Sequence, residues 1–541
     1  MFTEGFQSRR AAPPRAKVSL ELWGGVECTV NRTGDCYQDQ MRLTGHHDRA
    51  EDIDRLASLG IAALRFPMLW ERVAPDSPAQ CDWQWCDDRL ARLRAHGIRP
   101  IAGLVHHGSG PAYTSLLDDS FATGLAGHAA AAARRFPWIA EWTPVNEPLT
   151  TARFSALYGH WYPHVRDERS FWTALLNQID GVRLAMAAIR RVNPAARLVQ
   201  TDDLGRTWAT SRLADQAAFD NTRRWATWDL LSGRVNREHP LWERLCTFGL
   251  ADRLARIADA PCPPDVIGVN HYLTSDRFLD HRIHRYPRHV VGGNGAQAYA
   301  DIEAVRVLEP APGGIAGALR EAWDRYGTPL ALTELHNGCT REEQLRWIVQ
   351  GWNTCLALKQ DGVDVRAVAA WALFGSKGWN TLLTGPGAYE PGAWAVGGAQ
   401  PRLTGIGRLL KTMTTDEPAL LPPGLAGDGW WEREGRLLHA AVRRATPMRE
   451  HRATRTRRHE APPILVLGAS GTLGQAIARA CAHRNLPYRL IARSELDFGR
   501  QGSIGVALAR HAPWAVVNAA GWVRVDDAET DPARCMAANA E

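Results

Sequence analysis

The chain has 541 residues, of which 45% are hydrophobic and 23% charged, and a formal net charge of +6. This length favours two or more globular domains, and the small net charge gives no indication of nucleic acid binding. No apolar run reaches the roughly 18 to 20 residues of a membrane span. The N-terminal residues lack the apolar segment of a secretory signal, and scattered cysteines without a C-x-x-C motif are typical of reduced thiols. We therefore expect a cytoplasmic protein without a structural metal, a nucleic acid partner or a membrane partner.

Short apolar runs alternate with longer segments of helical periodicity between about residue 18 and residue 375. Continuous apolar runs indicate parallel strands buried on both faces, and the segments between them indicate the covering helices. Eight such units predict an α/β fold with a (β/α)8 TIM barrel, and an open doubly wound sheet is the alternative. The predicted strands are Glu21–Val26, Ala62–Pro67, Pro100–His106, Ala140–Val145, Arg197–Thr201, Val266–Tyr272, Leu330–Glu334 and Ala367–Leu373.

Polar residues recur where these predicted strands end. The carboxyl ends of barrel strands are where the chemistry of such folds takes place. A single histidine or asparagine there is usually structural, but polar residues at the same end of so many strands are hard to explain by packing. We therefore expect one site built from these positions: Arg65, His106, His107, Asn146, Glu147, Asp202, Asp203, Asn270, His271, Tyr272, Glu334 and Trp371.

Two of these residues are glutamates in well-defined sequence contexts. Glu147 lies in Thr143-Pro144-Val145-Asn146-Glu147-Pro148, and Glu334 lies in Leu332-Thr333-Glu334-Leu335-His336-Asn337-Gly338. Each follows an apolar run that is typical of a buried strand. Glycoside hydrolysis needs two carboxyl groups, one to protonate the leaving oxygen and one to attack the sugar or activate water. The pair therefore predicts a reaction as well as a fold.

The two glutamate motifs resemble the acid/base and nucleophile motifs of glycoside hydrolase family 1. Other blocks, from Leu22-Trp23-Gly24 to Trp371, agree with this family in order and spacing, so that the resemblance covers roughly residues 18 to 410. The resemblance implies a retaining β-glycosidase that needs no cofactor and acts on a small glycoside or oligosaccharide. It makes Glu147 the acid/base and Glu334 the nucleophile.

The same resemblance implies roles for the residues that would bind the substrate. Arg65 would keep Glu334 ionised, and Tyr272 would orient it. Asn146 would bond the 2-hydroxyl of the sugar, and His106 another hydroxyl. Trp371 is either an aromatic platform for the sugar or a core residue. The expected substrate-binding set is Arg65, His106, Asn146, Asn270, Tyr272 and Trp371.

Several positions depart from the family pattern. Leu335-His336 differs from the usual residues after the nucleophile, and Glu27-Cys28-Thr29 lies near the place of the usual glutamine on the first strand. The block Phe374–Asn380 lacks the usual sugar-binding glutamate. We therefore expect a different glycoside, such as one with a 6-deoxy or charged sugar. A barrel that binds a glycan without cleaving it is the alternative.

A polar, strongly basic stretch at residues 446–460 marks a break in the chain. It lacks an apolar period and interleaved aromatics, which favours an exposed linker over a nucleic-acid-binding tail. We therefore predict a barrel domain over residues 18–425, a connecting segment over 426–462 and a new α/β segment over 463–541.

The C-terminal segment begins with the apolar strand Ile464–Leu467 and the glycine-rich turn Gly468–Gly474, followed by an alanine-rich helix. Glycines in such a turn permit the close approach of a pyrophosphate to the helix N-terminus. After a second strand, Arg493 either pairs with the 2′-phosphate of NADP or is a solvated charge. The expected cofactor-binding residues are Gly468, Gly471, Thr472, Leu473, Gly474 and Arg493.

This segment resembles the N-terminal part of dTDP-4-dehydrorhamnose reductases. The blocks Arg493–Asp497, Val517–Ala520 and Val525–Glu529 carry the resemblance. It implies a partial Rossmann fold, NADP(H) and, in a longer chain, a dTDP-sugar. The segment has no Tyr-x-x-x-Lys motif, so we expect that it reduces nothing as it stands and that the sequence is a fragment of a longer fusion rather than one carrying a remnant. A reductase with an accessory barrel is the alternative function.

Overall fold

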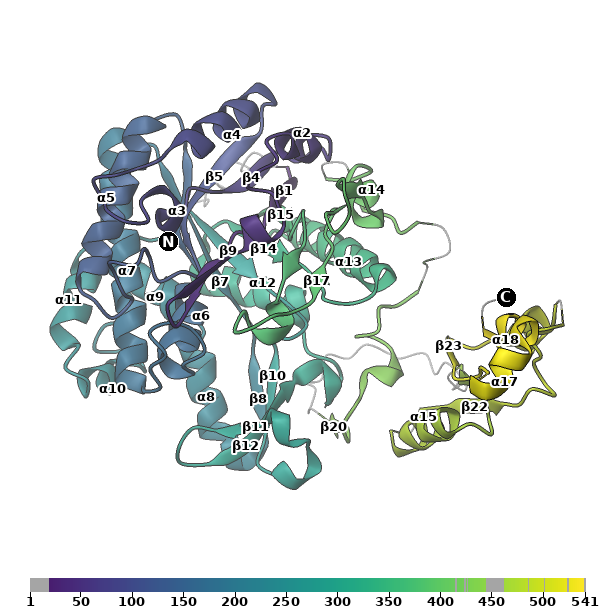
Figure 1. Ribbon diagram of the computed structural model, residues 1–541. Helices are drawn as coiled ribbons and strands as arrows, with labels where there is room; N and C mark the ends of the chain where they lie inside the picture. Colours follow the sequence, from purple (N-terminus) through teal and green to yellow (C-terminus); the bar gives the residue numbers. More distant parts are fainter. Residues whose placement is uncertain are drawn as a thin grey trace, which may run out of the picture. The chain divides into compact units, whose positions relative to one another are not determined.

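The computed structural model describes residues 19–413, 416–422, 425, 427–443, 462–484, 486–500, 502–522 and 525–539. They divide into two compact units, one drawn from residues 1–303 and 313–429 and the other from 304–312 and 430–541 (Figure 1). The predicted linker at 446–460 lies outside the described residues. The domain bounds 18–425, 426–462 and 463–541 therefore stay a prediction.

The first unit contains a closed barrel of parallel strands, which confirms the predicted (β/α)8 fold (Figure 1). The strands are hydrogen-bonded in the order β1-β15-β14-β9-β7-β6-β5-β4, with β4 closing on β1. Closure leaves no unpaired strand edge. The strands are β1 (Glu21–Gly25), β4 (Ala63–Pro67), β5 (Arg99–His106), β6 (Glu141–Asn146), β7 (Arg197–Asp203), β9 (Val266–Asn270), β14 (Leu330–Leu335) and β15 (Val365–Ala370).

Each strand lies within a few residues of its predicted position. The sixth ends at Asn270, so that Tyr272 follows the strand, and the eighth begins and ends earlier than expected, so that Trp371 follows it. The register between β9 and β14 shifts between Leu332 and Glu334. Such an irregularity changes the direction of a side chain at the end of a strand, and here it lies beside a predicted catalytic residue.

The barrel interior is filled by small and branched side chains rather than left as a pore. The large ring of Trp23 on β1 packs among alanines from neighbouring strands, and this mixture of sizes fills the tapering interior. The cluster consists of Trp23, Ala63, Ile101, Val199, Val266, Ala331, Ala367 and Ala369. Seven of the barrel strands contribute to it, so it supports the strand ends that carry the site.

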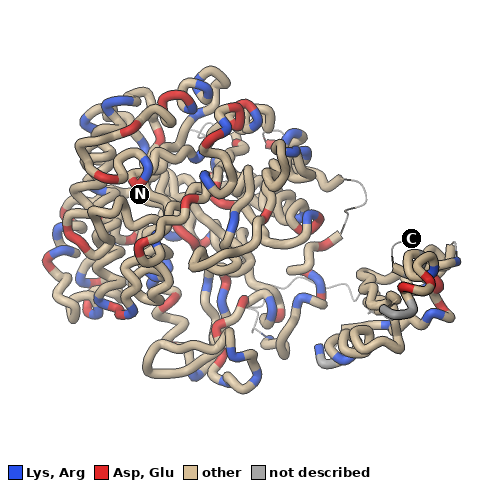
Figure 2. The backbone as a smooth tube through the Cα atoms, viewed as in Figure 1, with Lys and Arg blue, Asp and Glu red and all other residues tan. Residues whose placement is uncertain are grey.

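Helices surround the barrel (Figure 1). The longest, α7 (Glu168–Val192), begins at Asp167, whose side chain accepts a hydrogen bond from Ser170 N and so caps the helix. Of the helices in the described part of the chain, none is long and apolar enough to cross a membrane. Figure 2 shows acidic and basic residues mixed along the surrounding helices. The other helices with ten or more residues in this unit are α4 (Gln84–Ala95), α5 (Ser120–Arg135), α8 (Ala214–Arg223), α12 (Gly314–Tyr326) and α13 (Arg341–Gln360).

Smaller elements, which the sequence did not predict, extend the loops at the carboxyl ends of the barrel strands. A hairpin of β2 (Val30–Thr33) and β3 (Cys36–Asp39) follows β1. A four-stranded sheet in the order β11-β12-β10-β8 is built from the segments that follow β7 and β9. Its strands are β8 (Thr207–Ala209), β10 (Arg277–Asp280), β11 (Val291–Gly293) and β12 (Ala298–Glu303).

The second unit contains a three-stranded parallel sheet in the order β22-β21-β23. The strands are β21 (Ile464–Leu467), β22 (Tyr488–Ile491) and β23 (Ala515–Asn518), and they alternate with α15 (Thr472–His483) and α16 (Ser503–His511). This alternation is the beginning of a doubly wound fold and agrees with the predicted partial Rossmann segment. α17 (Val525–Thr530) and α18 (Pro532–Asn539) follow the sheet.

Candidate active site

The structure brings the predicted site residues together at the carboxyl ends of the barrel strands. One detail of the prediction was wrong: Arg65 lies in the middle of β4 and not at its end. Its buried side chain nevertheless reaches the site, because it extends across the barrel to β14. His106, Asn146 and Asn270 are the last residues of β5, β6 and β9, whereas the sequence predicts that the sixth strand runs on to Tyr272.

Glu334 is a buried carboxylate, 3% exposed, that is held as a hydrogen-bond acceptor. Arg65 Nη1 donates to its Oε1 at 2.6 Å, and the Tyr272 hydroxyl donates a short hydrogen bond to its Oε2. Burial and the charge of Glu334 raise the pKa of Tyr272 well above its usual value, so the phenol keeps its proton. Each carboxylate oxygen of Glu334 thus has a hydrogen-bond donor.

The guanidinium of Arg65 also fixes the amide of Asn146. Its Nη2 donates to Asn146 Oδ1 at 2.5 Å, and the Thr201 hydroxyl donates to the same oxygen at 2.7 Å. Because both partners donate, Asn146 Nδ2 faces the rings of His106 and His107, whose Nε2 atoms lie 3.2 and 3.3 Å away. Both rings accept at Nε2, so each imidazole is a neutral tautomer with its proton on Nδ1.

Glu147 occupies the turn between β6 and the short helix α6 (Pro148–Ala152), with a left-handed backbone at φ 46°. Asn270 Nδ2 donates to Glu147 Oε1 at 2.6 Å. The Thr333 hydroxyl donates to Asn270 Oδ1, also at 2.6 Å, and so fixes the direction of that amide. Because Oε1 accepts a hydrogen bond from Asn270, the proton of a neutral Glu147 belongs on Oε2.

The environment of Glu147 keeps its carboxyl protonated. Burial raises its pKa well above the usual range, and the negative charges of Glu334, Asp203 and Asp202 raise it further. The side chain is 4% exposed. A neutral carboxyl group beside an ionised one is the combination that lets one act as an acid and the other as a nucleophile.

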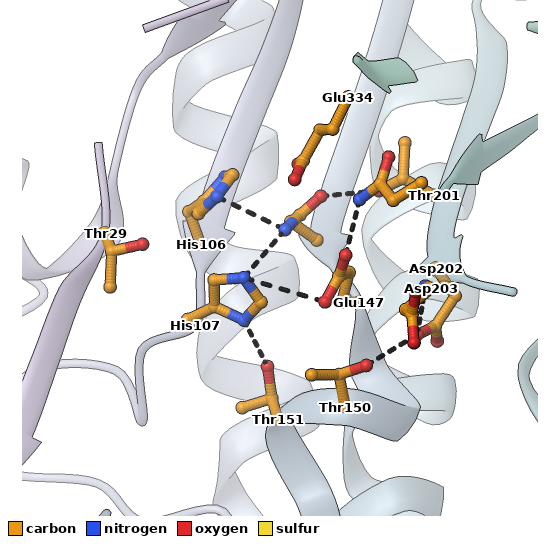
Figure 3. A network of polar contacts seen from close by, with 12 residues as sticks. Thr29, His106, His107, Glu147, Thr150, Thr151, Thr201, Asp202, Asp203 and Glu334 are labelled. Carbon is orange, nitrogen blue, oxygen red and sulfur yellow. Dashed lines mark hydrogen bonds and ion pairs between the residues drawn. The ribbon is translucent and has the colours of Figure 1, made fainter. Parts of the chain in front are cut away.

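His107 lies against the protonated oxygen of Glu147, as Figure 3 shows. Its Nε2 is 3.7 Å from Glu147 Oε2, and its Nδ1 is 3.1 Å from the Thr151 hydroxyl. Burial and the nearby charge of Arg65 lower the pKa of His107 to about 3. The ring is therefore neutral near pH 7 and places no positive charge beside Glu147 that would favour loss of its proton.

Asp202 anchors the helix that follows Glu147. It accepts hydrogen bonds from Leu149 N at 3.0 Å and from the Thr227 hydroxyl at 2.6 Å. Burial raises the pKa of Asp202 to about 6, while these hydrogen bonds oppose the shift. Figure 3 shows Asp202 and Asp203 together on the far side of Glu147 from His106. Asp202 thus joins β7 to α6 and holds the turn that carries Glu147.

Trp371 forms part of the site wall and is partly buried. Its ring lies parallel to that of His106, with the ring centroids 5.4 Å apart, and the Arg65 guanidinium carbon is 4.7 Å from its centroid. Gly25 makes room for the ring, since a Cβ at that position would lie 2.3 Å from it. A cavity of about 20 Å³, lined in part by Arg65, His106, Asn146 and Trp371, lies at this wall. It has room for about one water molecule.

The sequence predicts a strand-end position for His107 but no role for its side chain. It also gave no role to Thr201 and Thr333, whose hydroxyls set the directions of the two site amides. Threonines inside apolar strands look like ordinary β-branched strand residues, so the sequence carries little signal for this function. The adjacent pair His106-His107 was a usable signal, because His106 ends a predicted strand at the catalytic end and His107 follows it directly.

In the second unit, the predicted cofactor-binding residues lie at the carboxyl ends of two neighbouring strands. Gly468 has φ 89°, and a Cβ there would lie 2.6 Å from Ala519 O. A Cβ on Gly474, in α15, would lie 2.2 Å from Gly468 O. Arg493 follows β22, is largely exposed and lies 3.8 Å from Asp497. This close approach of backbone segments, which only glycine permits, fits a turn that holds a dinucleotide.

The comparisons with known proteins separate the same two parts. Residues 462–541 match the family model described as RmlD substrate binding domain. A dTDP-4-dehydrorhamnose reductase of Streptomyces griseus is 40% identical over 80 residues, which are 15% of this chain and 26% of that protein. The chain therefore spans about a quarter of the length of this reductase relative.

The barrel matches a different family. Beta-glucosidase 4 of Oryza sativa subsp. japonica is 24% identical over 406 residues, covering 66% of this chain and 82% of that protein. A family 1 β-glucosidase from Thermotoga maritima has a structure that superposes with a TM-score of 0.57 at 17% identity, over 72% of this chain and 96% of the other. The model for glycosyl hydrolase family 1 matches residues 27–382, more than half of the chain. The chain therefore belongs to glycosyl hydrolase family 1, and its barrel is a glycoside hydrolase domain.

Proposed function

We propose that the barrel is a retaining β-glycosidase in which Glu334 is the nucleophile and Glu147 is the acid/base. The observation that carries this proposal is the contrast between the two buried carboxyl groups. Glu334 accepts hydrogen bonds from Arg65 and Tyr272, whereas burial and nearby carboxylates raise the pKa of Glu147. When two neighbouring carboxyl groups have environments that push their pKa values apart, the group with the higher pKa can donate a proton and the other can act as the carboxylate.

In the first step, a carboxylate oxygen of Glu334 attacks the anomeric carbon of the bound sugar. The bond from this carbon to the glycosidic oxygen breaks, and the proton on Glu147 Oε2 passes to that oxygen, which leaves as an alcohol. The sugar remains attached to Glu334 as an ester. General acid catalysis of this kind contributes about 10²- to 10⁴-fold to a rate.

In the second step, a water molecule attacks the anomeric carbon and gives its proton to Glu147. The ester bond breaks, and Glu334 regains its carboxylate. Two displacements at the same carbon return the β-configuration, which requires carboxyl groups about 5 to 5.5 Å apart. Asn270 keeps its hydrogen bond to Glu147 Oε1, so the exchange of protons is directed to Oε2.

The remaining site residues would bind the sugar. Asn146 would form a hydrogen bond with the 2-hydroxyl of the sugar, and His106 would form one with another hydroxyl. Trp371 presents part of a ring to the apolar face of a pyranose. The relatives reported above are named as β-glucosidases, so a β-glucoside is the first substrate to test.

The test is hydrolysis of nitrophenyl β-glycosides by the full chain. The panel comprises the glucoside, galactoside, fucoside, rhamnoside and glucuronide. Turnover of at least one member should be lost in Glu334→Ala and kept in Glu243→Ala, which changes an exposed glutamate on α10 (Trp242–Cys246). The first product seen by proton NMR should be the β-anomer. An α-anomer as first product, or activity that survives Glu334→Ala, would contradict the proposal.

A second proposal concerns the C-terminal segment: we infer that it binds NADP(H). Gly468, Gly471 and Gly474 permit the backbone to approach a pyrophosphate at the start of α15, where Thr472 and Leu473 offer amide hydrogens. The exposed Arg493 is placed to pair with a 2′-phosphate. A bound nicotinamide cofactor would supply hydride for reduction of a sugar ketone, as expected for a reductase on a dTDP-sugar. Residues 463–541 do not contain the Tyr-x-x-x-Lys motif that the resemblance implies for this reduction.

Titration of the full chain with NADPH and NADH, followed by nucleotide fluorescence, tests this second proposal. We expect NADPH to bind more tightly than NADH, and Arg493→Ala to reduce that preference about tenfold or more, since the charge-assisted bonds of one arginine are lost. Arg489→Ala, which changes an exposed arginine on β22, is the matched control. If both variants bind NADPH equally well, Arg493 does not contact the 2′-phosphate and is a solvated charge. If the chain binds neither nucleotide, the proposal is contradicted.

A further inference from the structure

A third carboxyl group, Glu27, lies at the carboxyl end of the barrel and takes no part in the proposed reaction steps. It follows β1 by two residues and is 4% exposed, which equals the exposure of Glu147 and is close to the 3% of Glu334. Among the described residues, no lysine or arginine forms an ion pair with it. A carboxylate that is buried without a cation is costly, so its retention at this depth calls for an explanation.

The contacts of Glu27 tie it to the wall of the site. Its Oε2 accepts a hydrogen bond from Trp379 Nε1 at 2.9 Å, and its Oε1 accepts one from Thr29 N at 3.0 Å. The ring of Trp379 lies 5.5 Å from that of His107, which in turn contacts Glu147. The contacting rings of Trp379 and His107 therefore connect Glu27 to Glu147, the proposed acid/base.

Glu27 also lies close enough to Glu334 for the two charges to interact. Burial raises the pKa of Glu27, and the negative charge of Glu334 raises it further. The charge of Glu27 likewise contributes to the raised pKa of Tyr272. Cys28, the next residue, lines the same small cavity as Arg65, His106 and Asn146, so the segment that carries Glu27 forms part of the site wall.

The hydrogen-bonding capacity of Glu27 is only partly used. A carboxylate offers about four acceptor positions, and the bonds from Trp379 and Thr29 leave lone pairs on both oxygens. A ligand that donates hydrogen bonds would satisfy them, whereas a ligand with its own negative charge would be repelled by Glu27 and by Glu334 together. Sugar hydroxyl groups are donors of the required kind.

We propose that Glu27 is a specificity-determining residue that accepts hydrogen bonds from hydroxyl groups of the bound sugar and so selects uncharged sugars over sugars that carry a carboxylate or a phosphate. This inference rests on the proposed glycosidase function of the barrel. It narrows the choice that the sequence left open, because it disfavours a substrate with an anionic sugar.

The experiment compares the full chain with Glu27→Gln on the 4-nitrophenyl β-glycosides of glucose, glucuronic acid and glucose 6-phosphate. We expect the wild type to prefer the glucoside. Glu27→Gln should lower kcat/KM for the glucoside by about 10- to 100-fold, since hydrogen bonds to a charged acceptor are lost. The ratio of kcat/KM for the glucoside to that for each anionic glycoside should also fall. Glu243→Gln, which removes one exposed negative charge, should change neither value.

A binding measurement separates failure of this inference from failure of the glycosidase proposal. Calorimetric titration of Glu334→Ala, with and without Glu27→Gln, reports sugar binding whether or not the barrel cleaves its ligand. Binding of the glucoside that weakens with Glu27→Gln supports the inference even without turnover. Unchanged affinity and selectivity, tighter binding of an anionic glycoside, or no binding of any glycoside would overturn it. Glu27→Asp supplies a second variant if Glu27→Gln fails to fold.

Discussion

Arg65 Nη2 donates a 2.5 Å hydrogen bond to Asn146 Oδ1, and this contact fixes which way the amide of Asn146 faces. The same guanidinium donates to Glu334 at 2.6 Å. One side chain in the middle of β4 therefore sets the relative positions of strand ends that are far apart in the sequence. The amide that faces the two histidine rings and the carboxylate that faces the sugar both depend on it.

Replacing Arg65 with methionine should reduce both stability and activity. Removal of one partner leaves Glu334 as an uncompensated buried charge, which we expect to lower the free energy of unfolding by about 3 to 5 kcal/mol. Arg135→Met is the control, because its ion pair with Asp87 is exposed and worth about 0 to 1 kcal/mol. Urea unfolding followed by tryptophan fluorescence gives the comparison, and equal losses in the two variants would contradict the role assigned to Arg65.

Replacing Glu147 with glutamine should have an effect that depends on the leaving group. A glycoside with a poor leaving group needs the proton from Glu147, so its hydrolysis should slow by about 10²- to 10⁴-fold. A dinitrophenyl glycoside leaves without that proton, and formation of the ester should be nearly unchanged. Pre-steady-state release of the phenol measures this step, and equal losses for both substrates would exclude Glu147 as the acid.

Replacing Asp203 with asparagine should move the pH profile of activity. The first step needs protonated Glu147, so activity is present below its raised pKa and is lost as the pH rises through it. The charge of Asp203 contributes to that rise. Its removal should lower the pKa of Glu147 and shift the alkaline limb of kcat/KM to lower pH. Asp88→Asn, on α4, should leave the limb in place, and a shift to higher pH in Asp203→Asn would contradict the argument.

Replacing His107 with phenylalanine should lower kcat, and this loss should exceed the loss of kcat in a variant that is destabilised to a similar extent. The variant removes the acceptor for Asn146 Nδ2 and the neutral ring beside Glu147 Oε2. His128→Phe is a matched control, because His128 is also a buried neutral ring, with a pKa lowered to about 4 by burial. It lies on α5, and its Nε2 contacts Met68 O rather than a site residue. We expect His128→Phe to reduce the thermal midpoint with kcat preserved. If His107→Phe and His128→Phe have the same kcat, His107 has only a structural role and the prediction is contradicted.

Replacing Gly474 with valine should unfold the segment from β21 to β22 and leave the barrel intact. Any Cβ at this position would lie 2.2 Å from Gly468 O, so the turn between β21 and α15 would have to open. Hydrogen exchange of the full chain, analysed by mass spectrometry of peptides, should show faster exchange over residues 464–491 and unchanged exchange over the barrel strands. Gly505→Val, where a Cβ would meet nothing within 4 Å, is the control.

The barrel and the positions of Glu147 and Glu334 at its carboxyl end could be predicted from the sequence because their signals are local. Each buried strand is a continuous apolar run, and Glu147 and Glu334 follow such runs directly. Arg65 shows where local reasoning ends: its role depends on a side chain that crosses the barrel from the middle of a strand. The hydrogen bonds of Thr201 and Thr333 to the site amides are of the same kind, since they link strands far apart in the sequence.

The four-stranded sheet on the catalytic face escaped prediction for another reason. Its strands are three to six residues long, and β8 is separated from its partner β10 by several helices and the barrel strand β9. Pairing of this kind leaves almost no periodic signal in the sequence. The domain bounds stay a prediction, since most of the connecting segment lies outside the described residues.

The left-handed backbone of Glu147 has a consequence for the history of this family. A residue other than glycine in this conformation carries about 1 to 2 kcal/mol of strain, and its carboxyl group is buried as well. Glycine would adopt the same turn without that strain. With Glu147 as the proposed acid/base, selection for turnover and selection for a stable fold act in opposite directions at this one position. In a lineage that no longer cleaved glycosides, we expect this glutamate to be among the first residues replaced.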